Sequence, residues 1–153
     1  MEDNGAVSEE TPSQWPTDGF QAVFWATKRA LAEAADVSYR RHGVRDGQQF
    51  LLMALWEEDG LAPGELARRL GLATPTVTRA AIRMEAAGLV TREPDLHDRR
   101  LVRIHLTERG RTLRTILDAE MRALSDRALA GLGDAQRRQL LEALTQIRAN
   151  LSS

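Results

Sequence analysis

The placement of proline and glycine between residues 61 and 93 constrains the fold more than any other feature of the sequence. Pro63 and Pro75 each stand at a position typical of the first turn of a helix, where proline costs no hydrogen bond. Gly71 and Gly88 each stand where a helix is expected to end. This pattern predicts two short helices with a tight turn at Gly71.

The apolar residues of this stretch support both helices. They recur three or four residues apart, which places them on one face of each helix: Leu66, Leu70, Val77, Ala81 and Met84. Thr74 is expected to cap the second helix, because a threonine hydroxyl can accept a hydrogen bond from the first turn. Two short helices joined by such a turn form a helix-turn-helix pattern.

A β-hairpin is expected directly after these helices. The segments "LVTRE" (89–93) and "LVRIHL" (101–106) contain β-favouring residues, and the second alternates between two faces. Turn-forming residues lie between them: Pro94, Asp95 and Asp98. Thr107 is then expected to cap a long helix. A hairpin in this position is what a winged helix requires.

Further helices are expected on both sides of this region. One runs from residue 17 or 18 to about residue 41, and Gly43 ends it. The next begins with Asp46 as N-cap and Gln49 three residues later, which matches a capping box. The last carries a stripe that resembles a coiled coil and predicts a helical partner: Leu140, Leu144, Ile147 and Leu151.

Charge is distributed unevenly along the 153 residues, although the net charge is only −1. Residues 1–18 carry five acidic residues and no basic one. Residues 68–111 carry ten arginines against five acidic residues, a formal charge of +5. Because attraction to phosphates follows local charge, the central block is a candidate for binding nucleic acid.

Several classes of function are excluded by what the sequence lacks. Without cysteine it forms no disulfide, thiolate metal site or thiol redox sensor. No apolar run approaches the ~20 residues of a membrane span, and the acidic N-terminus is unlike a signal peptide, so we expect a cytoplasmic protein with no membrane partner. We find no nucleophile–base pair and no glycine-rich phosphate loop, and therefore expect no enzyme, no catalytic residues and no cofactor. The three histidines (His42, His97 and His105) are not expected to bind metal.

In this order, the helix-turn-helix, the hairpin and the flanking helices resemble the MarR family of bacterial transcription regulators. The resemblance is carried by "ELARRLGLATPTVTRAAIRMEAAGLVTRE" (65–93), by "HDRRLVRIHLTERG" (97–110), and by Gln48, Leu52 and Leu55. It covers roughly residues 17–151. One departure is Ala62, where such proteins often place a serine or threonine cap.

The resemblance implies a mainly α fold with an α+β wing: a winged helix-turn-helix domain with N- and C-terminal dimerisation helices. We therefore expect a flexible acidic arm (1–16), a dimerisation helix (17–43), the DNA-binding region (44–106) and C-terminal dimerisation helices (107–153). The implied function is a ligand-responsive repressor that binds double-stranded DNA as a homodimer on a pseudo-palindromic operator.

The expected DNA-binding residues lie on the second helix of the motif and on the wing. They are Pro75, Thr76, Thr78, Arg79, Arg83, Arg99 and Arg100. Arg79 is the best candidate to read a base, since arginine pairs with guanine O6 and N7 in the major groove. Arg100 is expected in the minor groove. Asp98 would repel phosphate, and we interpret it as the scaffold that holds the wing.

An effector site is also implied by the resemblance, because such regulators often bind small aromatic or phenolic molecules between the dimerisation helices and the DNA-binding lobe. The candidate residues are Trp25, Tyr39, His42, Phe50, Met53 and Trp56. Two alternatives stay open: a winged-helix regulator of another family, and a helical protein-interaction module without DNA binding. The arginines of helix and wing argue against the second.

Overall fold

The computed structural model describes residues 19–152, so the arm predicted at residues 1–16 lies outside the described residues. The structure divides after Glu33 into two units, which are described separately. Helix α1 (Gly19–Arg41) begins in the first unit and ends in the second.

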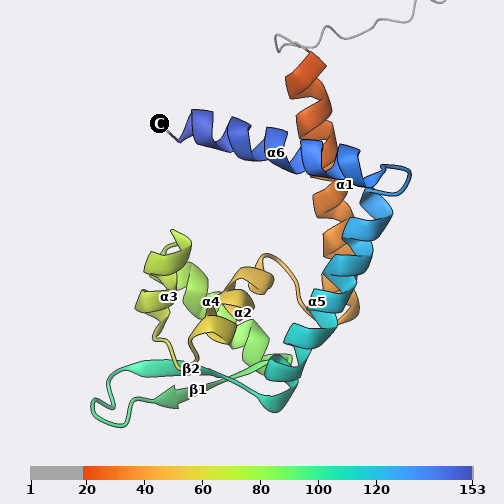
Figure 1. Ribbon diagram of the computed structural model, residues 1–153. Helices are drawn as coiled ribbons and strands as arrows, with labels where there is room; N and C mark the ends of the chain where they lie inside the picture. Colours follow the sequence, from red (N-terminus) through yellow and green to blue (C-terminus); the bar gives the residue numbers. More distant parts are fainter. Residues whose placement is uncertain (1–18, 153) are drawn as a thin grey trace, which may run out of the picture. The chain divides into compact units, whose positions relative to one another are not determined.

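The second unit contains five further helices and one hairpin among the described residues (Figure 1). In chain order they are α2 (Gln48–Glu57), α3 (Pro63–Leu70), α4 (Thr74–Ala86), β1 (Val90–Pro94), β2 (Val102–Leu106), α5 (Glu108–Ala128) and α6 (Asp134–Leu151). The predicted mainly α fold with a small β wing is confirmed. Gly71 joins α3 to α4 with a positive φ of 64°, a conformation that glycine adopts without strain.

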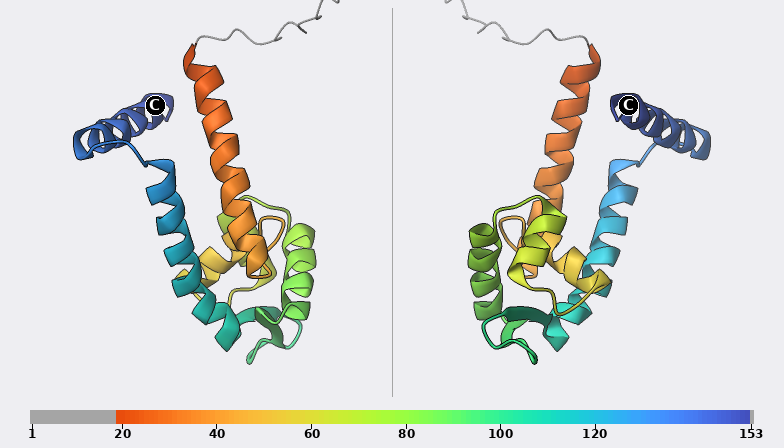
Figure 2. Two further views of the ribbon diagram at one scale, coloured as in Figure 1. Left: turned by 90° about the vertical axis from the view of Figure 1, so that its right-hand side faces the viewer. Right: turned by 90° about the vertical axis from the view of Figure 1, so that its left-hand side faces the viewer.

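The hairpin is antiparallel, with Val90 opposite Leu106 and Pro94 opposite Val102. A short bridge from Leu61 to Ile104 adds the segment before α3 to its other edge. Figure 2 shows the hairpin at the base of α2–α4, with α5 rising from its end. Strand β2 therefore forms backbone hydrogen bonds on both edges, to β1 within the wing and to the segment that leads into α3.

One apolar core holds α2, α3, α4, the hairpin and the start of α5 together. Its fully covered members include Leu52, Leu55, Leu66, Val77, Met84, Leu89 and Ile104. The inward faces predicted for α3 and α4 are confirmed, with Leu70 only partly buried. Burial of a large apolar side chain stabilises the fold by about 1.5–3 kcal/mol, so this core fixes the orientation of α4.

Two predicted helix starts are wrong in detail. Asp46 has a φ of 51°, and Gly47 is the residue that precedes α2. The backbone N–H of Arg45 donates to Gln48 Oε1 at 3.1 Å, so the glutamine that closes this turn comes one residue earlier than expected. Thr74 is the first residue of α4 and not its cap, because the extended residue before the helix is Ala73.

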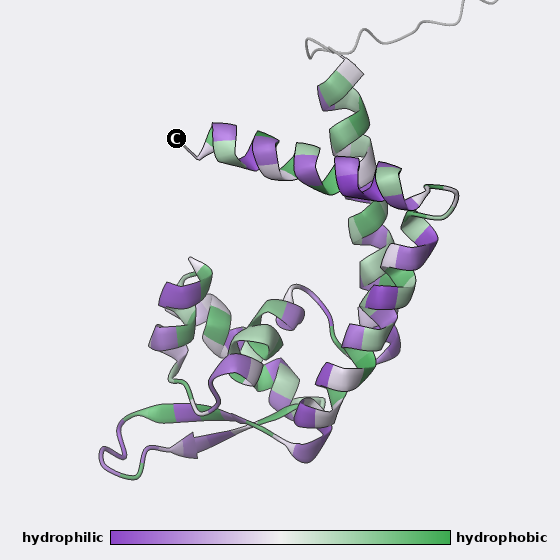
Figure 3. Cartoon of the chain, viewed as in Figure 1, coloured by the Kyte–Doolittle hydropathy of each residue, from purple (hydrophilic) through white to green (hydrophobic). Residues whose placement is uncertain are grey.

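Helix α6 differs from the other helices in having no buried residue in the described chain. Leu144 is 39% exposed, and hydrophobic residues recur along the helix in Figure 3. Its apolar stripe is therefore uncovered in the single chain. No helix in residues 19–152 is long and apolar enough to span a membrane.

Candidate nucleic-acid interface

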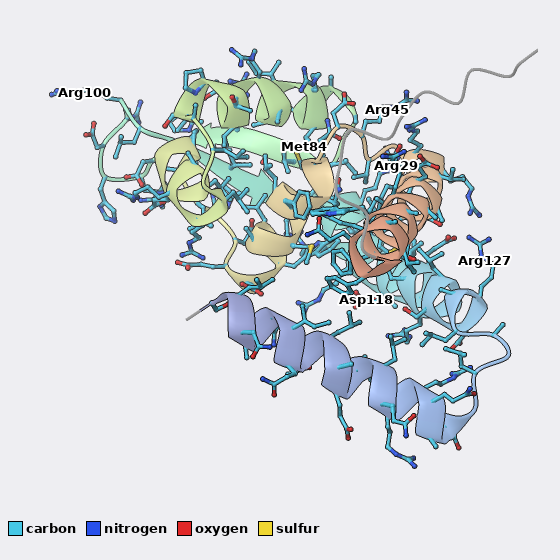
Figure 4. All side chains as sticks on the ribbon, turned by 90° about the horizontal axis from the view of Figure 1, so that it is seen from above. Arg29, Arg45, Met84, Arg100, Asp118 and Arg127 are labelled. Atoms are coloured by element: carbon cyan, nitrogen blue, oxygen red, sulfur yellow. The ribbon has the colours of Figure 1, made fainter. Side chains whose placement is uncertain are left out.

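Helix α4 presents one covered face and one open face. Val77, Ala81 and Met84 are completely buried, and Met84 lies inside the cluster of helices in Figure 4. The predicted DNA-binding residues Pro75, Thr76, Arg79 and Arg83 are all exposed. The core thus turns the predicted binding residues of α4 outward.

The polar side chains of this open face are mostly uncommitted within the protein. Arg79 and Arg83 have no ion-pair or hydrogen-bond partner among the described residues, and the Thr76 hydroxyl has none there either. Thr78 differs, because its hydroxyl donates to the carbonyl of Thr74 at 3.1 Å. Its proton is therefore used by the helix, and only its oxygen lone pairs remain for a ligand.

The ten arginines of residues 68–111 fall into two groups. Six contact other protein groups: Arg69 pairs with Glu58, Arg92 with Glu85, Arg103 with two carboxylates, Arg100 and Arg111 with aspartates at 3.9 Å, and Arg109 with backbone carbonyls. The other four have no such partner in the part of the chain that the structure describes: Arg68, Arg79, Arg83 and Arg99. An uncompensated guanidinium remains free to bind a carboxylate or phosphate bidentately.

The tip of the wing carries the two predicted arginines. Arg99 is exposed, and the side chain of Arg100 is 95% exposed. Arg100 stands at the outer end of the hairpin, away from the helices (Figure 4). The Asp98 carboxylate accepts a hydrogen bond from the Arg100 backbone at 3.1 Å and lies 3.9 Å from its Nε. Asp98 therefore shapes the turn that displays Arg100.

A second aspartate holds the wing more firmly. The carboxylate of Asp95 accepts from the backbone N–H groups of His97 at 2.8 Å and Asp98 at 2.9 Å. The same carboxylate pairs with Arg103, and only 8% of Asp95 is exposed. Chiefly the hydrogen bond from Arg103 holds the pKa of Asp95 well below its usual range, with the two backbone N–H groups adding to the effect.

Arg103 extends this anchor into the helix-turn-helix. It donates to the carbonyl of Gly60 at 3.0 Å and lies 3.4 Å from Glu65 of α3. Glu65 in turn accepts from the backbone N–H of Ala62 at 2.8 Å, which is the half of a capping box that needs no hydroxyl at Ala62. One chain of contacts therefore sets the position of the wing relative to α3.

The sequence predicts Asp95 only as a turn residue, and it gives Arg103 and Glu65 no role in holding the wing. Arg103 stands on the strand face opposite the buried Ile104, where alternation predicts a solvated side chain. The available signal was the capping pattern of Ala62 and Glu65, but nothing local links it to the wing.

A hollow of about 520 Å³ lies between α3, α4 and the wing. Its lining is rich in arginine and includes Arg68, Thr78, Arg92, Arg100 and Arg103. Arg92 and Arg103 are committed to Glu85, Asp95 and Glu65, whereas Arg68 has no partner among residues 19–152. The surface from α4 to the wing is therefore concave and basic.

Only part of the predicted effector set comes together. Tyr39, Met53 and Trp56 line a cavity of about 200 Å³ beside α5, with Gln49, Glu57, Arg114, Leu117, Asp118 and Met121. Burial raises the pKa of Tyr39. The Trp56 indole donates to the Gly110 carbonyl at 2.9 Å.

The remaining predicted effector residues lie elsewhere. His42 lines a different hollow and is 3.4 Å from Glu120, and Phe50 is 55% exposed. In the first unit, Trp25 packs edge-on against Phe24 with centroids 5.5 Å apart, and Lys28 lies 4.9 Å from its ring.

Comparison with known proteins gives consistent matches. Residues 46–102 match the model of the MarR family. The HTH-type transcriptional regulator TtmR of Methylorubrum extorquens (strain PA1) is 36% identical over 154 residues, covering 96% of this chain and 78% of that protein.

Solved structures match as well. The YusO protein from Bacillus subtilis aligns with a TM-score of 0.71 at 27% identity, over 88% of this chain and 92% of that one. A putative MarR family transcriptional regulator from Listeria monocytogenes, solved with 26mer DNA, aligns with a TM-score of 0.63 at 22% identity, over 88% and 89%. Both alignments cover 88% of this chain, a larger share than the residues 46–102 that match the family model.

Proposed function

This chain belongs to the MarR family of transcriptional regulators, and on that premise we propose that it binds double-stranded DNA as a homodimer and represses transcription. As a member of this family it is a transcriptional regulator and not an enzyme. The observation that carries the proposal is the exposure of the arginines on α4 and the wing, of which Arg79, Arg83 and Arg99 have no carboxylate partner among residues 19–152. DNA in complex with the Listeria relative supports the same conclusion.

In this proposal α4 enters the major groove and the wing reaches the adjacent minor groove. Arg79 reads a guanine, and Thr76 and Arg83 contact bases or phosphates near it. Arg100 enters the minor groove, where narrow A·T-rich segments concentrate negative potential. Asp95 and Asp98 contact the protein instead, and hold Arg100 at the required angle.

In the proposed function, each segment of the chain has a separate role. Residues 44–106 bind DNA, while residues 17–43 and 107–153 form the dimer. Support comes from the uncovered stripe of α6, which lacks any buried residue in the single chain. Two copies place two α4 helices about one helical turn of DNA apart, so the operator is a pseudo-palindrome.

A small aromatic effector is also part of the proposed function. The cavity lined by Tyr39, Met53 and Trp56 suits an aromatic ring, and its lining comes from the end of α1, from α2 and from α5. Its charged lining consists of Arg114 against Glu57 and Asp118, which favours a neutral phenol over a carboxylic acid. Occupancy would shift the lobe relative to the dimer helices and misalign α4 with DNA.

The test is a titration of the full chain against the DNA upstream of its own gene. Fluorescence anisotropy of the labelled DNA measures the affinity at several salt concentrations. Arg79→Ala is expected to weaken binding about tenfold or more, as for the loss of one bidentate base contact. Arg100→Ala is expected to weaken binding mainly to duplexes with A·T-rich flanks, and to reduce the salt slope by about one.

Arg138→Ala is the matched control, because it removes the same charge from an exposed site on α6. If all three variants bind like the wild type, the protein does not use α4 and the wing to bind DNA. If the wild type itself binds no DNA, the interaction-module alternative stands instead.

A further inference from the structure

One bulky apolar residue breaks the separation of faces on α4. Ile82 is 45% exposed, whereas Val77 and Met84 of the same helix are completely buried. Its neighbours in sequence on the open side are Arg79 and Arg83, neither of which has a partner among residues 19–152. A single exposed apolar residue is common on a protein surface, and Ile82 is informative because it lies beside the arginines proposed to bind DNA.

Helix geometry places Ile82 near the middle of the open face. An α-helix turns about 100° per residue, so Ile82 is about 60° from Arg79 and about 20° from Pro75 around the axis. The buried Val77, Ala81 and Met84 occupy the opposite side. A surface that lies against this face of α4 can therefore contact both Arg79 and Ile82.

The chemistry of the major groove supplies one apolar partner. Of the four bases, only thymine presents a methyl group there, while the other edge groups are hydrogen-bond donors and acceptors. A side chain made only of carbon gains by covering that methyl and loses by covering unpaired polar groups. We infer that Ile82 contacts the C5-methyl of a thymine and so makes the protein select T at that position; this inference rests on the proposed DNA binding.

The position of the thymine follows from the rise of the helix. Ile82 is the third residue after Arg79, so the two lie about 4.5 Å apart along the helix axis at about 1.5 Å per residue. Base pairs are stacked about 3.4 Å apart. The selected thymine therefore lies one or two base pairs from the base that Arg79 contacts.

The experiment removes the methyl group and the side chain separately. Full-length wild type first selects duplexes from a random-sequence library. Each thymine of one selected half-site is then replaced by deoxyuridine, which lacks only the C5-methyl, and affinities are measured for wild type and Ile82→Ala. One replacement is expected to weaken wild-type binding about fourfold, as for one buried methyl, and to leave Ile82→Ala unchanged.

Two further variants make the result specific. Ile82→Val, which loses a single methyl from an exposed site, is expected to show an intermediate sensitivity to the same deoxyuridine. Arg79→Ala is expected to bind more weakly but to keep the full deoxyuridine effect, because it retains Ile82. Thermal melting of each variant checks that an exposed substitution leaves the fold intact.

The outcomes separate this inference from the proposed function. If wild type selects no duplex, DNA binding itself fails. A second outcome concerns Ile82 alone: wild type binds, and Arg79→Ala weakens binding. If every deoxyuridine then lowers the DNA affinity of wild type and Ile82→Ala by the same factor, Ile82 does not read thymine. Unchanged affinity of Ile82→Ala for every duplex would also overturn the inference and leave this face to a protein partner.

Discussion

At the scale of single residues, the partners of each arginine separate structural from binding roles. Arg103 is surrounded by Asp95, Glu65 and the carbonyl of Gly60, so it stabilises the wing. Arg79 and Arg83 have the same side chain and no such partner in the described residues. The difference comes from the neighbouring elements, since the residue type is the same.

The wing anchor predicts a dependence of stability on pH. Because the pKa of Asp95 is lowered in the folded state, its contribution to stability is present above the unfolded value of about 4 and is lost as pH falls through the folded value. Asp95→Asn should therefore melt at a lower temperature than wild type at pH 7. The difference should shrink progressively below about pH 4.

Melting curves between pH 2.5 and pH 7 measure this effect. Asp98→Asn is the matched control, because Asp98 is exposed on the same turn and accepts fewer hydrogen bonds. Its melting temperature should stay close to that of wild type throughout. A constant gap between wild type and Asp95→Asn at every pH would refute the role assigned to the ion pair.

At the scale of elements, the first turn of α5 is joined tightly to the end of α4 and to β1. Thr107 caps α5 as predicted, with its hydroxyl oxygen accepting from Gly110 at 3.0 Å. That hydroxyl also donates to the carbonyl of Gly88 at 2.7 Å. The Gly110 backbone packs so closely on Leu89 that an added Cβ would collide with the Leu89 carbonyl. This contact fixes where the C-terminal helices leave the DNA-binding region.

Gly110→Ala is therefore expected to destabilise the protein by about 3 kcal/mol, the upper part of the usual range for overpacking. Gly64→Ala in α3 is the matched control, since an added Cβ there meets nothing within 4 Å. Alanine favours a helix more than glycine does, so Gly64→Ala should leave the free energy of unfolding unchanged or raise it by up to about 1 kcal/mol. Chemical denaturation of both variants measures the difference, and equal midpoints would contradict the proposed close contact.

At the scale of the whole molecule, α6 requires a partner that covers its apolar stripe. Its leucines are spaced for packing against a second helix, but residues 19–152 leave the helix without a buried residue. A second copy of the chain would cover the stripe and bring two α4 helices to one operator. Dimerisation and DNA binding are thus coupled in the proposed function.

Light scattering should accordingly give twice the chain mass of 17.0 kDa. Leu144→Glu places a charge in the stripe and should raise the dimer dissociation constant roughly a hundredfold or more, because an unpaired buried charge costs about 3 kcal/mol or more. Thr145→Glu adds the same charge beside the stripe and should leave the mass unchanged. A monomer in the wild type at all concentrations would rule out this assembly.

Much of the architecture could be predicted because its signals are local. Proline, glycine and apolar spacing located α3, α4 and the hairpin, and Thr107 marked the start of α5. The start of α2 was predicted less well, since Asp46 takes a positive φ that its sequence does not reveal. The outward position of Arg79 followed from helical periodicity alone.

By itself, the sequence determined the order of helices and strands, the inward faces of α3 and α4, and which side chains of α4 face solvent. These properties depend on spacings of three or four residues along one helix. The tertiary structure alone decided that Arg103 pairs with Asp95 and Glu65, and that Tyr39, Met53 and Trp56 share a cavity while His42 and Phe50 do not. Such contacts join residues far apart in the chain, and their geometry is set by the packing of the whole core.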